Sequence, residues 1–298
     1  IAFMGKTYTV EEATFDSFKG IDIALFAGGS ISKDFAPHAV KAGAVVIDNS
    51  SAFRMDPDVP LVVPEVNPQA ILKHKGIIAN PNCSTIIMVM ALKPIYDLAK
   101  IKRVIVSTYQ AVSGAGKEGI DELDAQVREH SEGREMTANI LPSASAEKYY
   151  PIAFNLIPQI DVFCDNLYTK EEMKMVNETK KIMEDYEMRI TATTIRVPVY
   201  RSHSESVNIE LEKEVDLGAM REALAKFPGV TVQDDPSKQE YPMPLYTSEK
   251  DDVYVGRLRR DESCEKSYNM WVVGDQIRKG AALNTLQIAE TMIKNGWI

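Results

Sequence analysis

Short apolar runs alternate with helical segments in the first third of the chain. The apolar runs lie at residues 21–27, 44–47, 61–63 and 76–79, and a helical pattern occupies residues 31–42. Strands that are apolar throughout are buried on both faces, and helical connections make neighbouring strands parallel. The alternation therefore predicts a doubly wound, Rossmann-like α/β domain built on a parallel sheet.

Polar clusters follow three of these strand-like runs, at residues 28–30, 48–53 and 80–85. In open parallel sheets, ligands bind at the carboxyl ends of the strands. We therefore expect the functional site at the edge of the sheet where these clusters meet.

The pattern changes after residue 103. Strand-like runs now lie at residues 104–111, 191–199, 206–211, 253–258 and 269–273. Alternating polar positions in some of them predict a mixed or antiparallel sheet, packed against helices at residues 170–186 and 217–227. We predict two domains. Residues 1–83 form the doubly wound domain, which the C-terminal helix within residues 276–298 completes, and residues 84–275 form an α+β domain.

Charge and cysteine content narrow the class of protein. The 298 residues carry 34 basic and 43 acidic side chains, a formal net charge of −9, which argues against a nucleic-acid partner. The longest apolar run is too short to span a membrane. The three cysteines Cys83, Cys164 and Cys264 are widely spaced, which predicts neither disulfides nor a metal site. A cytoplasmic protein with reduced thiols is the expectation.

Cys83 is the strongest candidate for a catalytic residue. The segment Asn-Pro-Asn-Cys-Ser-Thr at residues 80–85 joins a strand-like run to a helical run. At a helix N-terminus, free backbone N–H groups and the helix dipole lower the pKa of a thiol and can hold an oxyanion. The alternative is a buried structural cysteine, which we expect for Cys164 and Cys264.

Two further residues are candidates on chemical grounds. His203 lies in a polar segment between two strand-like runs, and its imidazole titrates near neutral pH, so it can act as acid or base. The alternative is a histidine in a surface loop. Arg196 lies in the middle of a strand-like run, where a guanidinium needs an anion. The anion that binds Arg196 is either a substrate carboxylate or a carboxylate of the protein in a structural ion pair, and spacing does not decide between them.

Several segments in one order resemble aspartate-semialdehyde dehydrogenases. Asn-Cys-Ser-Thr at residues 82–85 resembles the family's active-site segment, and the resemblance runs from about residue 20 to the C-terminus. The other matching segments lie at residues 49–55, 61–67, 109–116, 196–199 and 203–206. The resemblance implies an NADP-binding domain followed by a catalytic and dimerisation domain, and a homodimer.

The resemblance also assigns roles to individual residues. Cys83 is the nucleophile and His203 the acid or base. The remaining residues bind ligands: Gln110, Glu171 and Arg196 the substrate, Arg54 and Lys174 the phosphate, and Ser113, Gly114 and Asn284 the cofactor NADP. No metal is implied. From spacing alone, Glu171 and Lys174 are also consistent with a solvated ion pair on one helix face.

One family feature is missing. Family members begin with a strand and a Gly-x-Thr-Gly-x-Val-Gly loop, and nothing in this chain matches it. We expect the first domain to lack about one βα unit, roughly 30 residues. Residues 114–119 spell Gly-x-Gly-x-x-Gly, but no second strand with an acidic residue follows. This loop therefore does not predict a dinucleotide fingerprint.

The reaction implied by the resemblance is the reversible reductive dephosphorylation of aspartyl-4-phosphate to aspartate 4-semialdehyde through a thioester on Cys83. N-acetyl-glutamyl-phosphate reductase and glyceraldehyde-3-phosphate dehydrogenase are alternatives. The first carries Gly where this chain has Asn82, and the Ser-Cys-Thr-Thr-Asn of the second is absent. A catalytically silent, dimer-forming paralogue or fragment is an alternative of another class.

Overall fold

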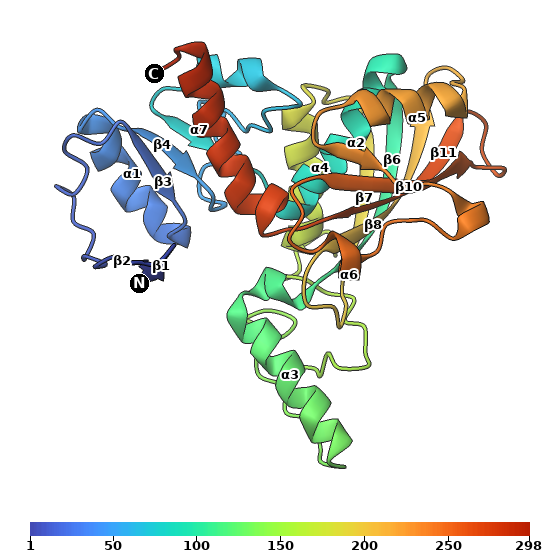
Figure 1. The fold of residues 1–298 in the computed structure, drawn as a ribbon, viewed down its shortest axis with the longest axis horizontal. Helices are drawn as coiled ribbons and strands as arrows, with labels where there is room; N and C mark the ends of the chain where they lie inside the picture. The colour runs from blue at the N-terminus through green and yellow to red at the C-terminus, as the bar shows by residue number, and fades with distance from the viewer.

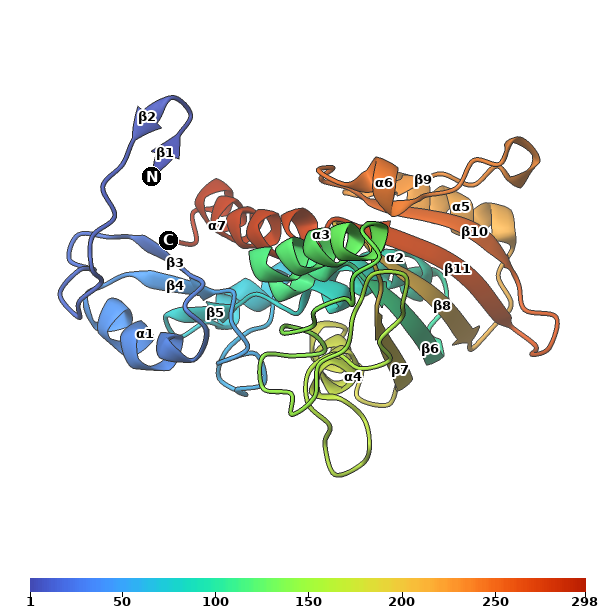
Figure 2. The same cartoon turned by 90° about the horizontal axis from the view of Figure 1, so that it is seen from below.

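The computed structural model describes residues 1–298 and contains two main sheets, one in each half of the molecule (Figures 1 and 2). The smaller sheet has three parallel strands in the order β3-β4-β5, with bounds Ile23–Phe26, Val45–Asp48 and Ile77–Ala79. Register pairs Ile47 of β4 with Leu25 and with Ile78. The predicted parallel sheet is confirmed.

Helices cover both faces of this small sheet. Successive side chains of β4 point to opposite faces. Val46 packs with alanines of α1 (Ser32–Lys41), whereas Ile47 packs with Ile288 and Met292 of α7 (Leu283–Asn295). The small alanine side chains of α1 let its backbone lie close to the sheet. The C-terminal helix therefore returns to the first sheet, as Figure 1 shows.

One expectation for this half, the strand at residues 61–63, needs correction. Residues 61–63 form no strand, because only Leu61 makes a bridge, with Ala79 of β5. The first residues of the chain form a short exposed hairpin of β1 (Ala2–Phe3) and β2 (Lys6–Thr7). Each of these strands has only two residues, so the hairpin buries little surface and contributes little to the stability of the fold.

The larger sheet is mixed, as predicted. Its strands are β6 (Ile101–Gln110), β7 (Arg189–Arg196), β8 (His203–Leu211), β9 (Val230–Val232), β10 (Val253–Arg260) and β11 (Ser267–Gly274). Their order is β7-β6-β8-β11-β10-β9, with parallel pairs at β6/β7 and β9/β10 and antiparallel pairs elsewhere. The sequence analysis missed β9, which has only three residues.

One face of the large sheet is buried under three helices, α2 (Cys83–Leu98), α4 (Lys170–Ile182) and α5 (Leu217–Lys226). α2 is buried along nearly its whole length, and Met88 and Leu92 pack in one cluster with Val106 of β6. Helices that are apolar all round are buried in this way. No helix in the structure has both the length and the apolar character needed to cross a membrane.

A helical arm projects from the body of the molecule. α3 (Lys117–Ser131) follows a short 3-10 helix, η3 (Val112–Ala115), and extends away from both sheets in Figure 1. A small cluster around Leu123, Leu141 and Ile152 packs the irregular chain after α3 against it. The remaining short elements are α6 (Pro244–Thr247), three further 3-10 helices (Gly29–Ile31, Pro68–Lys73, Pro236–Lys238), and a π-helical turn, Arg278–Ala282, ahead of α7.

Candidate active site

Cys83 is the first residue of α2, immediately after the loop that leaves β5. Asn82 is the N-cap of this helix. Its side-chain oxygen accepts hydrogen bonds from the backbone N–H groups of Ser84 and Thr85, at 3.1 and 3.2 Å. Such a cap fixes the first turn and typically stabilises a helix by about 1 kcal/mol. The sequence prediction that Cys83 begins a helix is confirmed.

The acidity of Cys83 differs from the sequence expectation. Burial, and then the nearby carboxylate of Glu171, raise the pKa of the thiol to about 12, although Arg54 and Arg196 oppose this. The predicted lowering of this pKa by the helix terminus is therefore wrong. The loss of water around sulfur outweighs the dipole, so the resting group is a neutral thiol.

His203 is the first residue of β8 and is fully buried, so it is no surface histidine. Its Nδ1 accepts a hydrogen bond from the backbone N–H of Ala111 at 3.0 Å. A backbone N–H only donates, so the neutral ring carries its proton on Nε2, which lies 3.5 Å from the side-chain nitrogen of Gln110. Burial, and then the charge of Arg196, lower the pKa of His203 to about 3.

Arg196 is the last residue of β7 and is buried without an ion-pair partner. Its Nη1 donates to the carbonyl of Ala111 at 2.7 Å, and its Nε has no partner. A Cβ atom on Gly114 would lie 2.7 Å from Arg196 Nη1 and 3.2 Å from His203 Cε1. The backbone of Gly114 therefore lies directly against the side chains of Arg196 and His203. The structural ion pair that spacing left open for Arg196 is not formed.

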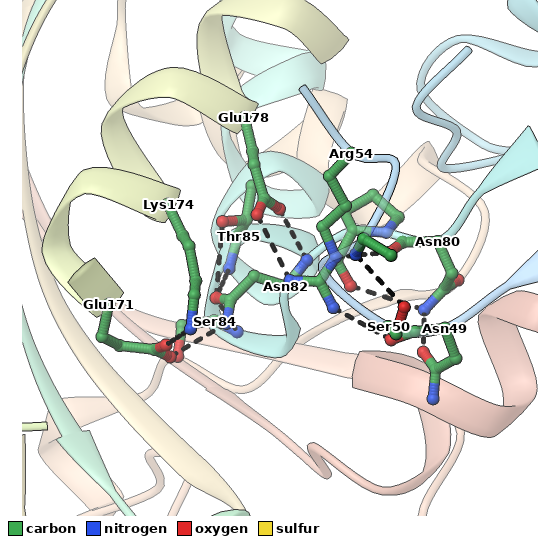
Figure 3. A network of polar contacts seen from close by, with 12 residues as sticks. Asn49, Ser50, Arg54, Asn80, Asn82, Ser84, Thr85, Glu171, Lys174 and Glu178 are labelled. Carbon is green, nitrogen blue, oxygen red and sulfur yellow. Dashed lines mark hydrogen bonds and ion pairs between the residues drawn. The ribbon is translucent and has the colours of Figure 1, made fainter. Parts of the chain in front are cut away.

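Glu171 joins the substrate-binding candidates to the nucleophile helix (Figure 3). Its Oε1 accepts from Asn82 Nδ2 at 2.9 Å and from Gln110 Nε2 at 3.2 Å. Burial alone would raise the pKa of Glu171, but the charge of Lys174 and these hydrogen bonds lower it to about 2. The carboxylate is therefore ionised inside the site.

Lys174 forms the ion pair that the helical spacing suggested. Its Nζ lies 3.0 Å from Glu171 Oε2 and 3.0 Å from Asp161 Oδ2. The pair is not a solvated one, because Glu171 is buried. Burial would lower the pKa of Lys174, but the two carboxylates raise it above its ordinary value. The phosphate-binding role of Lys174 stays a prediction.

Arg54 lies in the loop after β4 and is held on three sides. Its Nε donates to the Asn80 carbonyl at 2.9 Å, its Nη2 to the Asn49 carbonyl at 3.0 Å, and its Nη1 to Glu178 Oε1 at 3.3 Å. The guanidinium has five N–H groups, so two remain for a ligand. Sequence reasoning missed Glu178 and Asn82. Glu178 follows Glu171 by seven positions on one helix face, a spacing that the sequence already contained.

The cofactor candidates lie in different surroundings. The Ser113 hydroxyl donates to the Tyr200 carbonyl and accepts from the side-chain amide of Gln276. The Asn284 amide is fully buried: it donates to the Val62 carbonyl and to Asn80 Oδ1, and accepts from Lys279. Both N–H groups of the Asn284 amide are thus engaged within the protein, and its cofactor contact stays a prediction.

Arg196 and His203 occupy the space that a side chain at Gly114 would need, so only glycine fits there, and its contact with the cofactor stays a prediction. No strand directly follows α3, so the Gly-x-Gly-x-x-Gly segment is not part of a βαβ unit. Its last glycine, Gly119, packs against the Val112 carbonyl, where a Cβ atom would lie at 2.5 Å.

Known proteins share this arrangement. The family model described as semialdehyde dehydrogenase, dimerisation domain, matches residues 92–279, and the model for the NAD binding domain matches residues 2–74. An aspartate-semialdehyde dehydrogenase of Aquifex aeolicus (strain VF5) is 57% identical over 303 residues, covering 100% of this chain and 87% of the relative. The chain belongs to the aspartate-semialdehyde dehydrogenase family.

Other members support the assignment. The aspartate-semialdehyde dehydrogenase of Bacillus subtilis (strain 168) is 53% identical over 99% of this chain and 86% of that protein. The crystal structure of aspartate semialdehyde dehydrogenase II from Vibrio cholerae matches with a TM-score of 0.90 and 46% identity, covering 99% of this chain and 86% of that one. A second structure of that enzyme, with the same scores, is described as complexed with ASA.

Family membership confirms the resemblance seen in the sequence and makes the chain an oxidoreductase with an NAD-binding domain. It also decides against the two alternative families, N-acetyl-glutamyl-phosphate reductase and glyceraldehyde-3-phosphate dehydrogenase.

Proposed function

We propose that this chain catalyses the reversible conversion of aspartyl-4-phosphate to aspartate 4-semialdehyde and inorganic phosphate, with NADP as cofactor and a thioester on Cys83. One observation beyond the family assignment carries the proposal. Arg196 is a buried cation without a carboxylate partner, next to His203. A buried charge without a counterion is costly, so the site is built to receive an anion.

The substrate α-carboxylate is the anion that suits Arg196, because a planar guanidinium binds a carboxylate through two parallel hydrogen bonds. The ionised Glu171 then attracts the substrate amino group. The two residues have opposite charges and contribute to one site through Gln110, which pairs with Arg196 in the register of β6 and β7 and donates to Glu171. Together they recognise an α-amino acid backbone.

The leaving phosphate is assigned to Arg54, with Lys174 as the second cation. Arg54 keeps two free N–H groups, and its loop runs beside the N-terminus of α2. In the biosynthetic direction, Cys83 sulfur attacks the acyl carbon, a carbon–sulfur bond forms, and the carbon–oxygen bond to phosphate breaks. Because the resting group is a neutral thiol, its proton is transferred as the carbon–sulfur bond forms, and the departing phosphate accepts it.

His203 serves the carbonyl oxygen. With Nδ1 held by the Ala111 N–H, Nε2 carries the proton and donates to the oxygen when that oxygen becomes negatively charged. As the semialdehyde leaves, the carbon–oxygen double bond re-forms and the carbon–sulfur bond breaks, and the departing Cys83 thiolate takes up a proton, for which His203 is the acid. A bound NADPH supplies the hydride that reduces the thioester. NADP rather than NAD, and a homodimer, are taken from the family resemblance.

The test is phosphate-dependent reduction of NADP, with NAD in parallel, by aspartate semialdehyde, using the chain and its Cys83→Ser variant. Turnover that requires both phosphate and Cys83 is the expected result. Equal turnover of the Ser variant would remove the thioester from the mechanism. No turnover by the unsubstituted chain would instead favour the catalytically silent paralogue.

A further inference from the structure

α4 carries a stripe of four charged residues that faces the site. Glu171, Lys174, Glu178 and Lys181 are spaced by three, four and three positions, so they lie on one side of the helix. The first two belong to the substrate end of the site. The last two contact the loop that carries Arg54, and the reaction outlined above gives them no role.

Glu178 contacts both the phosphate candidate and the nucleophile helix. Its Oε1 accepts from Arg54 Nη1 at 3.3 Å, and its Oε2 accepts from the backbone N–H of Asn82 at 2.6 Å. Asn82 caps α2 one residue before Cys83. One carboxylate therefore fixes the position of the guanidinium relative to the first turn of α2 (Figure 3).

The position of Glu178 is unusual for a residue with only a packing role. Its side chain is almost fully buried, and burial raises the pKa of this carboxyl above its ordinary value despite Arg54. Keeping a carboxylate there costs free energy, which its contacts with Arg54 and the Asn82 N–H offset. An apolar side chain of similar size would fill the same volume without that cost.

Lys181 binds the backbone of the loop that carries Arg54. Its Nζ donates to the carbonyl oxygens of Arg54, Asp56 and Val59 at 2.7 to 2.8 Å. α4 therefore holds Arg54 by its side chain and its main chain. Without these contacts, a loop residue with a long side chain would have to lose rotamer freedom each time phosphate bound.

We propose that Glu178 is a positioning residue for phosphate, which acts by fixing Arg54 against the N-cap of the helix that begins at Cys83. The proposal rests on the assignment of phosphate to Arg54. Substrates that carry no phosphate group do not need this contact. Loss of the contact between Glu178 and Arg54 is therefore expected to weaken the binding of phosphate far more than the binding of the aldehyde.

Glu178→Gln is the informative substitution. It keeps size and shape, but an amide has only one acceptor oxygen, so its NH₂ group must face a donor, either Arg54 or the Asn82 N–H. Glu172→Gln is the matched control. Glu172 is also buried on α4, but its carboxylate accepts from the backbone N–H groups of Thr169 and Thr194, away from the Arg54 loop.

Two measurements test the proposal on the whole chain. Titration calorimetry with inorganic phosphate gives a dissociation constant without turnover, and steady-state rates give KM for phosphate and for aspartate semialdehyde. We expect Glu178→Gln to weaken phosphate binding about tenfold, as for loss of a hydrogen bond to a charged group, and to leave KM for the aldehyde within about twofold. Glu172→Gln is expected to change neither constant by more than about twofold.

A double-mutant cycle with Arg54→Lys separates positioning from general packing. If Glu178 acts through Arg54, its substitution has little further effect on phosphate in the Arg54→Lys background. A full tenfold loss in that background would overturn the proposal, as would unchanged phosphate binding in Glu178→Gln. If Glu178→Gln does not fold, Glu178→Asp, which keeps the charge and lengthens both contacts, is read by the same criteria.

Failure of the proposed function has a different signature. If the unsubstituted chain reduces NADP without phosphate, or does not bind phosphate at all, both the reaction and the role of Glu178 are wrong. If the unsubstituted chain binds phosphate and turns over, but Glu178→Gln matches it, only the positioning role is wrong.

Discussion

The backbone N–H of Ala111 donates to Nδ1 of His203 across 3.0 Å and thereby sets which ring nitrogen carries the proton. The same residue accepts from Arg196 through its carbonyl oxygen at 2.7 Å. One peptide segment at the end of β6 thus orients both side chains. Since Nδ1 has no acceptor to face when protonated, the imidazolium is disfavoured in addition to the effects of burial and Arg196.

The depressed pKa of His203 predicts an acid-sensitive fold. Between about pH 6.5, its unfolded value, and about pH 3, its folded value, the unfolded chain binds one more proton than the folded chain. The free energy of unfolding therefore falls as pH falls through this window, by about 2 kcal/mol at pH 5 from this group. Urea unfolding at pH 7 and pH 5 measures this, with His203→Gln as comparison. An equal pH dependence in the variant would show that His203 is not the cause.

Cys83 is expected to be unreactive in the free protein. With the pKa of its thiol raised to about 12, little thiolate exists at pH 7, and iodoacetamide should modify Cys83 at least about tenfold more slowly than the exposed Cys264. Peptide mass spectrometry over time measures both rates in one sample. Rapid modification of Cys83 near neutral pH would restore the activation expected from the helix N-terminus alone.

Gly114→Ala is expected to damage the site while the fold persists. The new Cβ atom would lie 2.7 Å from Arg196 Nη1, so Arg196 or the loop must shift, at a cost of about 1–3 kcal/mol. We expect kcat/KM to fall about 100-fold, since small displacements of catalytic groups have effects of this size. Gly218→Ala, in the first turn of α5, is the control, because its Cβ atom would meet only the end of the Asp216 side chain. Activity retained in Gly114→Ala would show that the site tolerates the shift.

Lys181→Met is expected to loosen the loop after β4. Methionine keeps the apolar stem but removes the donor to three carbonyl oxygens, so stability should fall by about 2 kcal/mol. Hydrogen exchange should increase in residues 54–59 and not in α4 beyond its last turn. Chemical denaturation and exchange mass spectrometry test this together. Unchanged hydrogen exchange in residues 54–59 would mean that the turns within this loop, and not Lys181, keep it ordered.

Much of the architecture was legible in the sequence. Continuous apolar runs with helices between them predicted the parallel sheet, because the period of side-chain burial is local information. Residues 61–63 were misread as a strand because they are apolar and buried, while a strand also requires a partner of matching length. The sequence cannot supply that partner, which lies elsewhere in the chain.

The sequence by itself determined the identity of the chemical groups: Cys83 at a helix start, His203 as the titratable base, and Arg196 as a cation in need of an anion. The tertiary structure decided their state. Burial raised the pKa of Cys83 and lowered that of His203, the Ala111 N–H chose the histidine tautomer, and α4 brought Glu178 to Arg54, which is 124 positions away in the chain. Residue type is encoded locally, whereas desolvation and charge pairing depend on which distant segments fold against one another.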